Sequence, residues 1–174
     1  VIGAVTIDNG LAYVGASDHT FRAIDIHTGK VAWVYNKVKG YIETKPLITD
    51  DKVIFGAWDN TLYALDKNDG KEIWKWTGGL TRMHFSPAAV WPVAAEGKVF
   101  IADPQRALTA IDLENGKTVW RTFESQVRET VGLSEDGKQI YSKTMNDSIV
   151  CFATQGDEPK KLWASNVGFG YEHA

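Results

Sequence analysis

The chain has 174 residues, of which 44% are hydrophobic and 24% charged, an ordinary balance for a folded globular domain. Its net charge of −3 offers no general electrostatic attraction to nucleic acid or to an anionic membrane surface. The single cysteine, Cys151, excludes an internal disulfide and a cysteine metal cluster, and no run approaches the about 18 apolar residues of a membrane helix.

One pattern recurs along the chain: alanine, a hydrophobic residue and aspartate, then a Gly-Lys turn, then a tryptophan four residues after that glycine. The tryptophans stand at positions 33, 74, 120 and 163, with spacings of 41, 46 and 43. A period of about 40–50 residues predicts a solenoid, a propeller or an array. The structural positions of the repeat are Ala23, Asp25, Gly29 and Trp33; Ala64, Asp66, Gly70 and Trp74; Ala110, Asp112, Gly116 and Trp120; and Trp163 of a degraded fourth copy.

In chain order, each repeat predicts four short strands, because β-branched and aromatic runs alternate with turns rich in Gly, Asn and Asp. The first repeat places them at residues 3–7, 11–16, 20–25 and 30–35. The second places them at residues 46–49, 53–57, 61–66 and 72–76.

The third repeat predicts strands at residues 92–95, 99–102, 107–112 and 118–123. The fourth predicts them at residues 129–133, 139–143, 148–153 and 161–164, with a longer last turn that contains Gly156 and Pro159. No segment has the pattern of a long amphipathic helix, and residues 166–174 are expected to begin a further cycle.

Four short strands per repeat, arranged radially, make a propeller blade, and blades must stack face to face to share a core. We expect the small side chains of Ala23, Ala64 and Ala110 to leave room for a neighbouring blade's indole. The repeated aspartates are expected to be structural.

The repeated motif resembles the tryptophan-docking repeat of pyrroloquinoline-quinone (PQQ)-type, quinoprotein-like propellers, which are WD-like in their blade pattern. The run from Trp91 to Phe100 (Trp-Pro-Val-Ala-Ala-Glu-Gly-Lys-Val-Phe) is similar to the inner-strand motif of the same family. The resemblance covers nearly the whole chain, although the fourth copy lacks the aspartate and the Gly-Lys turn. It implies an exported bacterial protein, in the periplasm, the cell envelope or outside the cell.

The resulting fold prediction is all-β: four consecutive four-stranded antiparallel blades, forming part of a ring of about seven or eight. A single partial domain over residues 1–174 would hold blades at about 1–36, 42–77, 91–124 and 128–165, and the start of another at 166–174. We expect a longer protein with fused domains to supply the remaining blades; the alternative is that two copies pair into one ring.

By analogy with other propellers, the loops that enter the inner strands and the turns between second and third strands should share one face. That face would carry the candidate contacts with a ligand or partner. The lengthened loop 77–91 is the strongest candidate, since it holds a cation, an imidazole and aromatic residues. The full set of candidates is Glu43, Lys45, Trp58, Arg82, His84, Arg106, Arg128, Glu129, Glu172 and His173.

Each candidate also has a simpler interpretation. The glutamates, with Lys45 and Arg128, are the residue types of salt bridges between blades. His84 is a packing or solvent-facing histidine on that interpretation, and Asp18-His19 and Asp59-Asn60 are turn residues. An indole at the Trp58 turn is less ordinary and favours a contact surface.

Motifs of hydrolases, metalloproteases and phosphate-binding loops are absent from the sequence, so we identify no catalytic residue and no metal ligand. The resulting hypothesis is a non-catalytic binding or scaffold module without a cofactor, for a protein partner or small ligand, with no nucleic acid and no membrane span. The alternative is a fragment of a PQQ-dependent dehydrogenase. In that family the quinone is held by a tryptophan platform, a Ca²⁺ ion and an adjacent cysteine pair, and this chain lacks the pair.

Overall fold

The computed structural model describes residues 3–78 and 90–168, with residues 129 and 130 described by their backbone only. Sixteen strands form four antiparallel sheets, and in each sheet the strands pair in chain order. Sheet 1 holds β1 (Thr6–Asp8), β2 (Leu11–Gly15), β3 (Phe21–Asp25) and β4 (Val31–Tyr35); sheet 2 holds β5 (Leu47–Ile48), β6 (Lys52–Ala57), β7 (Thr61–Asp66) and β8 (Glu72–Thr77). Sheet 3 holds β9 (Val93–Ala95), β10 (Lys98–Ala102), β11 (Leu108–Asp112) and β12 (Thr118–Thr122); sheet 4 holds β13 (Val127–Leu133), β14 (Gln139–Thr144), β15 (Ser148–Ala153) and β16 (Lys161–Asn166).

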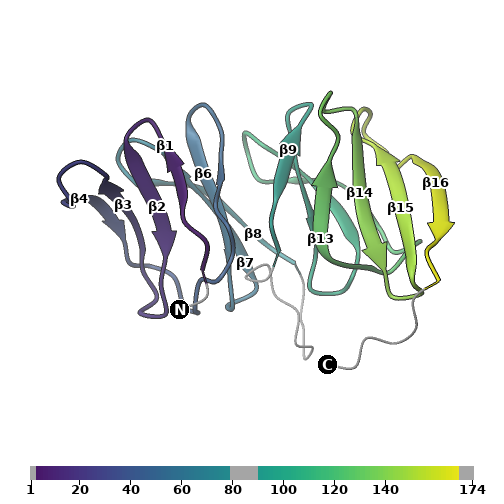
Figure 1. Ribbon diagram of the computed structural model, residues 1–174, viewed down its shortest axis with the longest axis horizontal. Coiled ribbons are helices and arrows are strands. Elements are labelled where there is room, and N and C mark those ends of the chain that lie inside the picture. The colour runs from purple at the N-terminus through teal and green to yellow at the C-terminus, as the bar shows by residue number, and fades with distance from the viewer. Residues whose placement is uncertain (1–2, 79–89, 169–174) are drawn as a thin grey trace.

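The four sheets follow one another along the molecule in chain order (Figure 1). The turns between second and third strands, and the connectors that lead from one sheet to the next, lie at one end of the strands. We call this end the connector face. The turns that carry the repeated aspartate and glycine lie at the opposite end. The predicted all-β fold of four-stranded antiparallel sheets is therefore confirmed.

The repeated aspartate builds the turn between the third and fourth strands. Asp25 Oδ1 accepts hydrogen bonds from the backbone N–H groups of His27 and Thr28, at 2.9 and 2.8 Å. Gly29 then closes the turn at φ 68°, a conformation that costs glycine little, and its N–H donates to the Asp25 carbonyl at 2.9 Å. Asp66 and Asp112 accept the matching bonds in sheets 2 and 3.

The repeated alanine stands directly opposite the tryptophan of its own sheet. The register pairs Ala23 with Trp33, Ala64 with Trp74 and Ala110 with Trp120. Side chains paired across strands lie on the same face, so the alanine makes room for its own sheet's indole. The expectation that it accommodates a neighbour's indole is wrong. Cys151 takes the alanine's place opposite Trp163 in sheet 4, and burial raises the pKa of its thiol.

The first two tryptophans join consecutive sheets in the same way. Trp33 Nε1 donates to the Lys67 carbonyl of sheet 2 at 3.2 Å, and Trp74 Nε1 donates to the Leu113 carbonyl of sheet 3 at 2.9 Å. The indoles rest on the turn glycines: a Cβ atom at Gly70 would lie 2.5 Å from Cε3 of Trp33. Glycine is therefore required at these turns for a second reason, the close approach of the ring.

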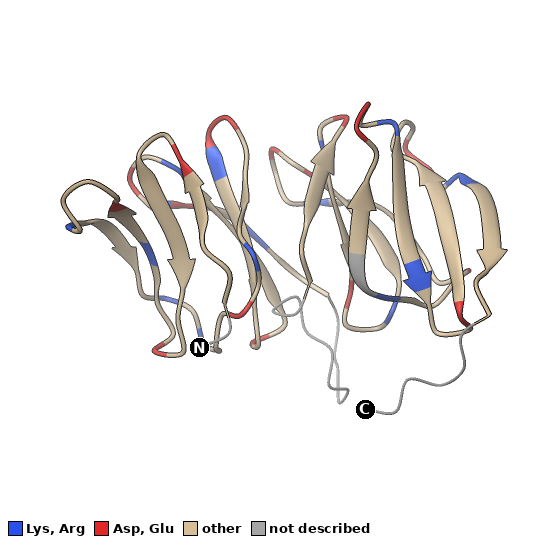
Figure 2. Cartoon of the chain, in the orientation of Figure 1, with Lys and Arg blue, Asp and Glu red and all other residues tan. Residues whose placement is uncertain are grey.

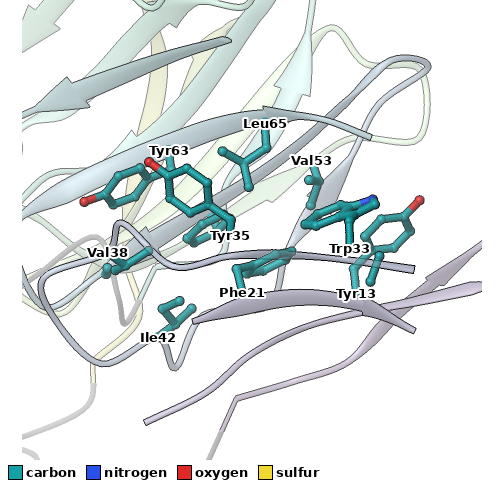
Figure 3. Close-up of a cluster of buried hydrophobic side chains, with 12 residues drawn as sticks. Tyr13, Phe21, Trp33, Tyr35, Val38, Ile42, Val53, Tyr63 and Leu65 are labelled. Carbon is teal, nitrogen blue, oxygen red and sulfur yellow. The ribbon is translucent and has the colours of Figure 1, made fainter. Parts of the chain in front are cut away.

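Three clusters of buried side chains fill the spaces between consecutive sheets. Figure 3 shows the first cluster, where the aromatic rings of sheet 1 face sheet 2. The Phe21 and Phe55 rings stack there with centroids 4.0 Å apart. Val38 and Ile42 of the connector between the sheets close one side of this cluster. The connector is thus anchored by the same core that joins the sheets.

Within the described residues, no helix has the length and apolar character needed to cross a membrane. Acidic and basic residues are dispersed over turns and strand edges, as Figure 2 shows for one side of the molecule.

Candidate functional site

The connector between sheets 1 and 2, residues 36–46, packs on the turn between β6 and β7. The backbone N–H of Trp58 donates to the Tyr41 carbonyl at 2.9 Å. The Lys39 N–H donates to Asp59 Oδ2 at 2.8 Å. Two segments that meet only in the folded chain are therefore held in one fixed arrangement on the connector face.

This arrangement displays a group of aromatic side chains, which we call the aromatic patch: His19, Tyr41 and Trp58. The rings of His19 and Tyr41 meet edge to face with centroids 5.2 Å apart. Tyr41 is 52% exposed and Trp58 39% exposed. Trp58 Nε1 donates to Glu43 Oε2 at 3.0 Å, which fixes the orientation of the exposed indole. The predicted candidates Glu43 and Trp58 thus lie together.

Asp59, in the turn next to Trp58, accepts the hydrogen bonds that hold the aromatic patch in place. Its Oδ1 accepts the Thr61 N–H at 3.1 Å, and its Oδ2 accepts the Tyr63 hydroxyl at 2.6 Å. Burial and this hydrogen bond raise the pKa of Tyr63, so its hydroxyl stays a donor. Asp59 is therefore more than a turn residue, because it binds the turn, the buried tyrosine and the connector at once.

Lys45 lies further along the same connector, beside the first strands of the sheets. Its Nζ stands 5.5 Å from the centroid of the Trp91 ring, a cation–π distance. Both residues border a pocket of about 310 Å³, which is lined by Thr6, Lys45, Pro46, Leu47, Ile48, Trp91, Pro92, Val93 and Val131. The predicted Lys45 thus contacts an exposed indole and borders a small pocket between the inner strands.

In sheet 3 the equivalent turn is organised by a buried carboxylate, Asp103. Its Oδ1 accepts the backbone N–H groups of Gln105 and Ala107, and its Oδ2 accepts the Thr109 hydroxyl at 2.9 Å. Arg121 of β12 forms an ion pair with the same carboxylate. This internal network fixes the turn, and sequence reasoning did not single out Asp103 and Arg121 as partners.

The predicted candidates Arg106 and Arg128 lie close to each other in the chain's fold. The Arg106 carbonyl accepts the Val127 N–H at 2.9 Å, next to Arg128 at the start of β13. Glu129 lies in the same strand, and its side chain is outside the described residues. The structure therefore places two groups of predicted candidates on the connector face, Glu43 and Trp58 at sheets 1 and 2, and Arg106 and Arg128 at sheets 3 and 4.

Four predicted candidates lie outside the described residues: Arg82, His84, Glu172 and His173. Tyr41 was not predicted, although it lies only two residues from Glu43. The sequence signal available was an aromatic residue directly after Gly40, in the connector between two predicted strands.

Chemically, the described face offers aromatic surfaces, carboxylates and cations. Among the side chains that the structure describes, no group of three or more His, Cys, Asp or Glu could hold a metal ion. The Trp58 indole is hydrogen-bonded to Glu43, so its exposed ring is presented in a fixed orientation.

A family model described as the outer membrane protein assembly factor BamB matches residues 1–77 of the chain. The dehydrogenase subunit of a quinone-dependent alcohol dehydrogenase from Komagataeibacter europaeus is 30% identical, over 97% of this chain and 24% of its own length. The assembly factor BamB of Yersinia pestis is 29% identical, over 72% of this chain and 31% of its own length. The chain thus spans about a quarter to a third of the length of these two relatives.

The crystal structure of BamB from Moraxella catarrhalis has the same fold, with a TM-score of 0.75 over 95% of this chain and 53% of that one, at 20% identity. The motif, the four sheets, the indole contacts between sheets and these similarities agree. The chain is built from the PQQ-type, tryptophan-docking β-propeller repeat.

Proposed function

We propose that this segment is a non-catalytic binding module that presents its connector face to a protein partner in the bacterial cell envelope. The observation that carries the proposal is the aromatic patch, in which Tyr41 and Trp58 are exposed and yet held by contacts with His19 and Glu43. Exposed, preorganised aromatic side chains are the residues that most often dominate binding energy at protein interfaces.

The charge around the patch supports a protein rather than a nucleic acid as the partner. Glu43 accepts the Trp58 indole N–H, and Asp18, next to His19 in the chain, is paired with Arg22. The overall charge is also negative, at −3. A carboxylate held against an exposed indole complements a protein segment with apolar and basic side chains better than it does a phosphate group.

The position of the patch in the chain supports the envelope as the compartment. His19, Tyr41, Glu43 and Trp58 all lie within residues 1–77, the part that matches the outer membrane assembly factor model. That relative's description names assembly of outer membrane proteins, and we infer a scaffolding role of the same general kind for this segment.

Site-specific photo-crosslinking tests this proposal. A photoreactive amino acid replaces Tyr41 in one variant and Lys117 in the control; Lys117 is exposed at the opposite end of the strands. Each purified variant is irradiated in an envelope extract of the producing bacterium, and adducts are identified by mass spectrometry. We expect a discrete adduct from position 41, because a residue that dominates binding contacts the partner directly. The adduct from position 117 should be at least about tenfold weaker.

Trp58→Ala in the position-41 variant should reduce that adduct severalfold while the circular dichroism spectrum stays unchanged. Equal adducts from both positions, or an adduct that Trp58→Ala leaves intact, would show that the connector face is not the binding surface.

A second candidate is a segment of a PQQ-dependent dehydrogenase, favoured by the 30% identity with the Komagataeibacter subunit along 97% of the chain. A PQQ-dependent dehydrogenase needs a Ca²⁺ ion beside the quinone, and the described residues form no group of three or more His, Cys, Asp or Glu that could hold it. The lone cysteine also cannot form the adjacent pair. Titration with PQQ and Ca²⁺, followed by absorbance and melting temperature, separates the two. We expect no saturable change, and saturable binding would overturn the non-catalytic assignment.

A further inference from the structure

The outer strand of sheet 1, β4, has one side without a neighbouring strand. Sheet 1 has the order β1-β2-β3-β4, so β4 pairs with β3 on one side only (Figure 1). We call the other side the β4 edge. Such an edge carries backbone N–H and C=O groups that can pair with another extended chain, and proteins usually protect it with charged side chains.

The β4 edge lacks the charges that the other outer strands carry. The sequence of β4 is Val-Ala-Trp-Val-Tyr, without a charged residue, as Figure 2 shows. By contrast, β8 carries Glu72 and Lys75, β12 carries Arg121 and β16 carries Lys161. Valine, tryptophan and tyrosine also favour extended structure. Among the outer strands that the structure describes, β4 is therefore the one suited to pairing with a further strand.

One position shows this difference most directly. The register places Val34 at the point of sheet 1 that Lys75 occupies in sheet 2 and Arg121 in sheet 3. Val34 is 49% exposed. The Lys75 side chain is 56% exposed although sheet 1 lies next to its strand. A neighbouring sheet on that side therefore leaves this point of an outer strand accessible.

A groove extends from the end of β4 to sheet 2. Its volume is about 440 Å³, and it is lined by residues 34–37 of one sheet and residues 69–72 of the other. The carboxylates in its wall are already paired. Asp69 pairs with Lys71 at 2.6 Å, and Glu72 accepts a tyrosine hydroxyl and pairs with a lysine of its own strand. The groove therefore complements a further negative charge better than a positive one.

Lysines stand at both ends of the β4 edge. Lys30 directly precedes β4, and Lys37 follows it by two residues. Lys71 lines the groove together with Lys37, and 83% of its side chain is exposed. A second copy of β4 placed on this edge would bring lysines against lysines in either orientation, and like charges destabilise strand pairing. A strand with carboxylates at its ends complements the edge instead.

We propose that the β4 edge binds an extended segment of a partner protein, which adds a fifth strand to sheet 1 and places a carboxylate beside Lys37 and Lys71. The matching segment has about five uncharged, β-branched residues flanked by Asp or Glu, the length of β4. Its backbone pairs with β4, and its side chains cover Val31 and Val34, which are 51% and 49% exposed. This surface is separate from the connector face, so the inference does not depend on the proposed function.

A synthetic peptide tests the pairing. The probe is a fluorescein-labelled peptide with capped ends and the sequence Glu-Val-Thr-Val-Thr-Val-Glu, whose anisotropy is followed as the 174-residue chain is added. We expect saturable binding. The same peptide with lysines in place of both glutamates should bind at least about tenfold more weakly, because like charges then meet at both ends of β4. Lys37→Gln should weaken binding of the glutamate peptide severalfold.

Val34→Lys gives the β4 edge the lysine that sheet 2 carries at the same point. This variant should weaken binding at least about tenfold, because a charge on the edge opposes the approach of another strand. Leu162→Lys is the matched control. It places the same charge on an outer strand far from β4, at a side chain that is 41% exposed, and should leave the affinity unchanged within about twofold.

Methylated peptides test the backbone pairing with the unaltered chain, which removes any effect of a substitution on folding. Two glutamate peptides carry N-methyl groups on alternate residues, one peptide on each of its two edges. An N-methyl group removes a donor and blocks pairing on its own edge. One peptide should therefore lose binding, whereas the other, whose methyl groups point to solvent, should keep it.

Several outcomes would overturn the proposal. They are no saturable binding of the glutamate peptide, equal binding of the lysine peptide, and equal binding or equal loss for the two methylated peptides. A dimer of the chain that Val34→Lys dissociates would also overturn it, because the occupant would then be a second copy. Trp58→Ala should leave peptide binding intact, which separates the β4 edge from the connector face.

Discussion

The four repeated tryptophans occupy the same place in the sequence pattern, and yet their indoles have three different environments. Trp33 and Trp74 donate their N–H to a carbonyl of the next sheet. Trp120 is 5% exposed, and its Nε1 has no hydrogen-bond partner among the described residues. Trp163 is half exposed. The difference at Trp120 follows from sheet 4, where the Asp and Gly-Lys turn is missing.

This difference predicts the cost of removing the N–H group. Trp33→Phe should lower the free energy of unfolding by about 1–2 kcal/mol more than Trp120→Phe does, because it removes the indole donor of the Lys67 carbonyl and leaves only the longer bond from the Tyr13 hydroxyl, at 3.4 Å. At position 120 the same change removes a buried N–H donor that has no acceptor, so no hydrogen bond is lost there. Urea unfolding followed by circular dichroism measures both values.

Trp74→Phe should behave as Trp33→Phe does, since its N–H donates to Leu113 at 2.9 Å. An equal or greater loss for Trp120→Phe would show that its indole N–H is satisfied in solution, and that sheet 4 offers a carbonyl after all.

At the scale of elements, the connector between sheets 1 and 2 is fixed by a close approach of two backbones. A Cβ atom at Gly40 would lie 2.5 Å from Asp59 N and 2.7 Å from the carbonyl carbon of Trp58. Those neighbours are backbone atoms, which cannot rotate away as a side chain does. The position of the aromatic patch therefore depends on the missing side chain at Gly40.

Gly40→Ala should destabilise the chain by about 1–3 kcal/mol, the usual cost of forcing an extra methyl group into a packed site. It should also shift the fluorescence of Trp58, because the connector must move away from the turn. Gly132→Ala is the matched control: its nearest neighbour would be 3.9 Å away, so we expect a change within about 0.5 kcal/mol. Equal effects of the two substitutions would contradict the close approach.

Strands and their order could be predicted from the sequence, whereas contacts between distant segments could not. The predicted strands 61–66 and 148–153 agree with β7 and β15, because alternating apolar residues and turn residues encode them locally. The exposed face with Glu43 and Trp58 was also predictable from the repeat. Two contacts could not be predicted: the close approach of Gly40 to Asp59, and the pairing of Ala23 with its own sheet's Trp33. Both depend on how separate segments meet in the folded chain, which a local sequence pattern does not encode.

At the scale of the whole molecule, the buried tyrosines in the cluster between sheets 1 and 2 make stability depend on pH. The Tyr35 hydroxyl of sheet 1 donates to Glu72 of sheet 2, and the Tyr63 hydroxyl donates to Asp59. Burial, followed by these hydrogen bonds, raises the pKa of both tyrosines above the ordinary value of about 10. Tyr13 shifts in the same direction, through burial and the nearby Asp8.

The sign of the effect follows from linkage. A group whose pKa is raised by folding contributes stability that is complete below its unfolded pKa and is lost as the pH rises through its folded pKa, since only the unfolded chain releases the proton. The free energy of unfolding should therefore fall as the pH rises above about 10. The slope is at most about 1.4 kcal/mol per pH unit for each such tyrosine, which corresponds to the release of one proton.

Tyr35→Phe with Tyr63→Phe should lower the stability at pH 7, because two hydrogen bonds donated by buried tyrosines are lost, and should flatten the decline above pH 10. Urea unfolding at intervals from pH 7 to pH 11 measures both effects. Their opposite directions make the test specific, since a variant that merely packs badly loses stability at every pH. A decline as steep in the double variant as in the original chain would mean that other groups control alkaline stability, and that these tyrosines ionise alike in the folded and unfolded chain.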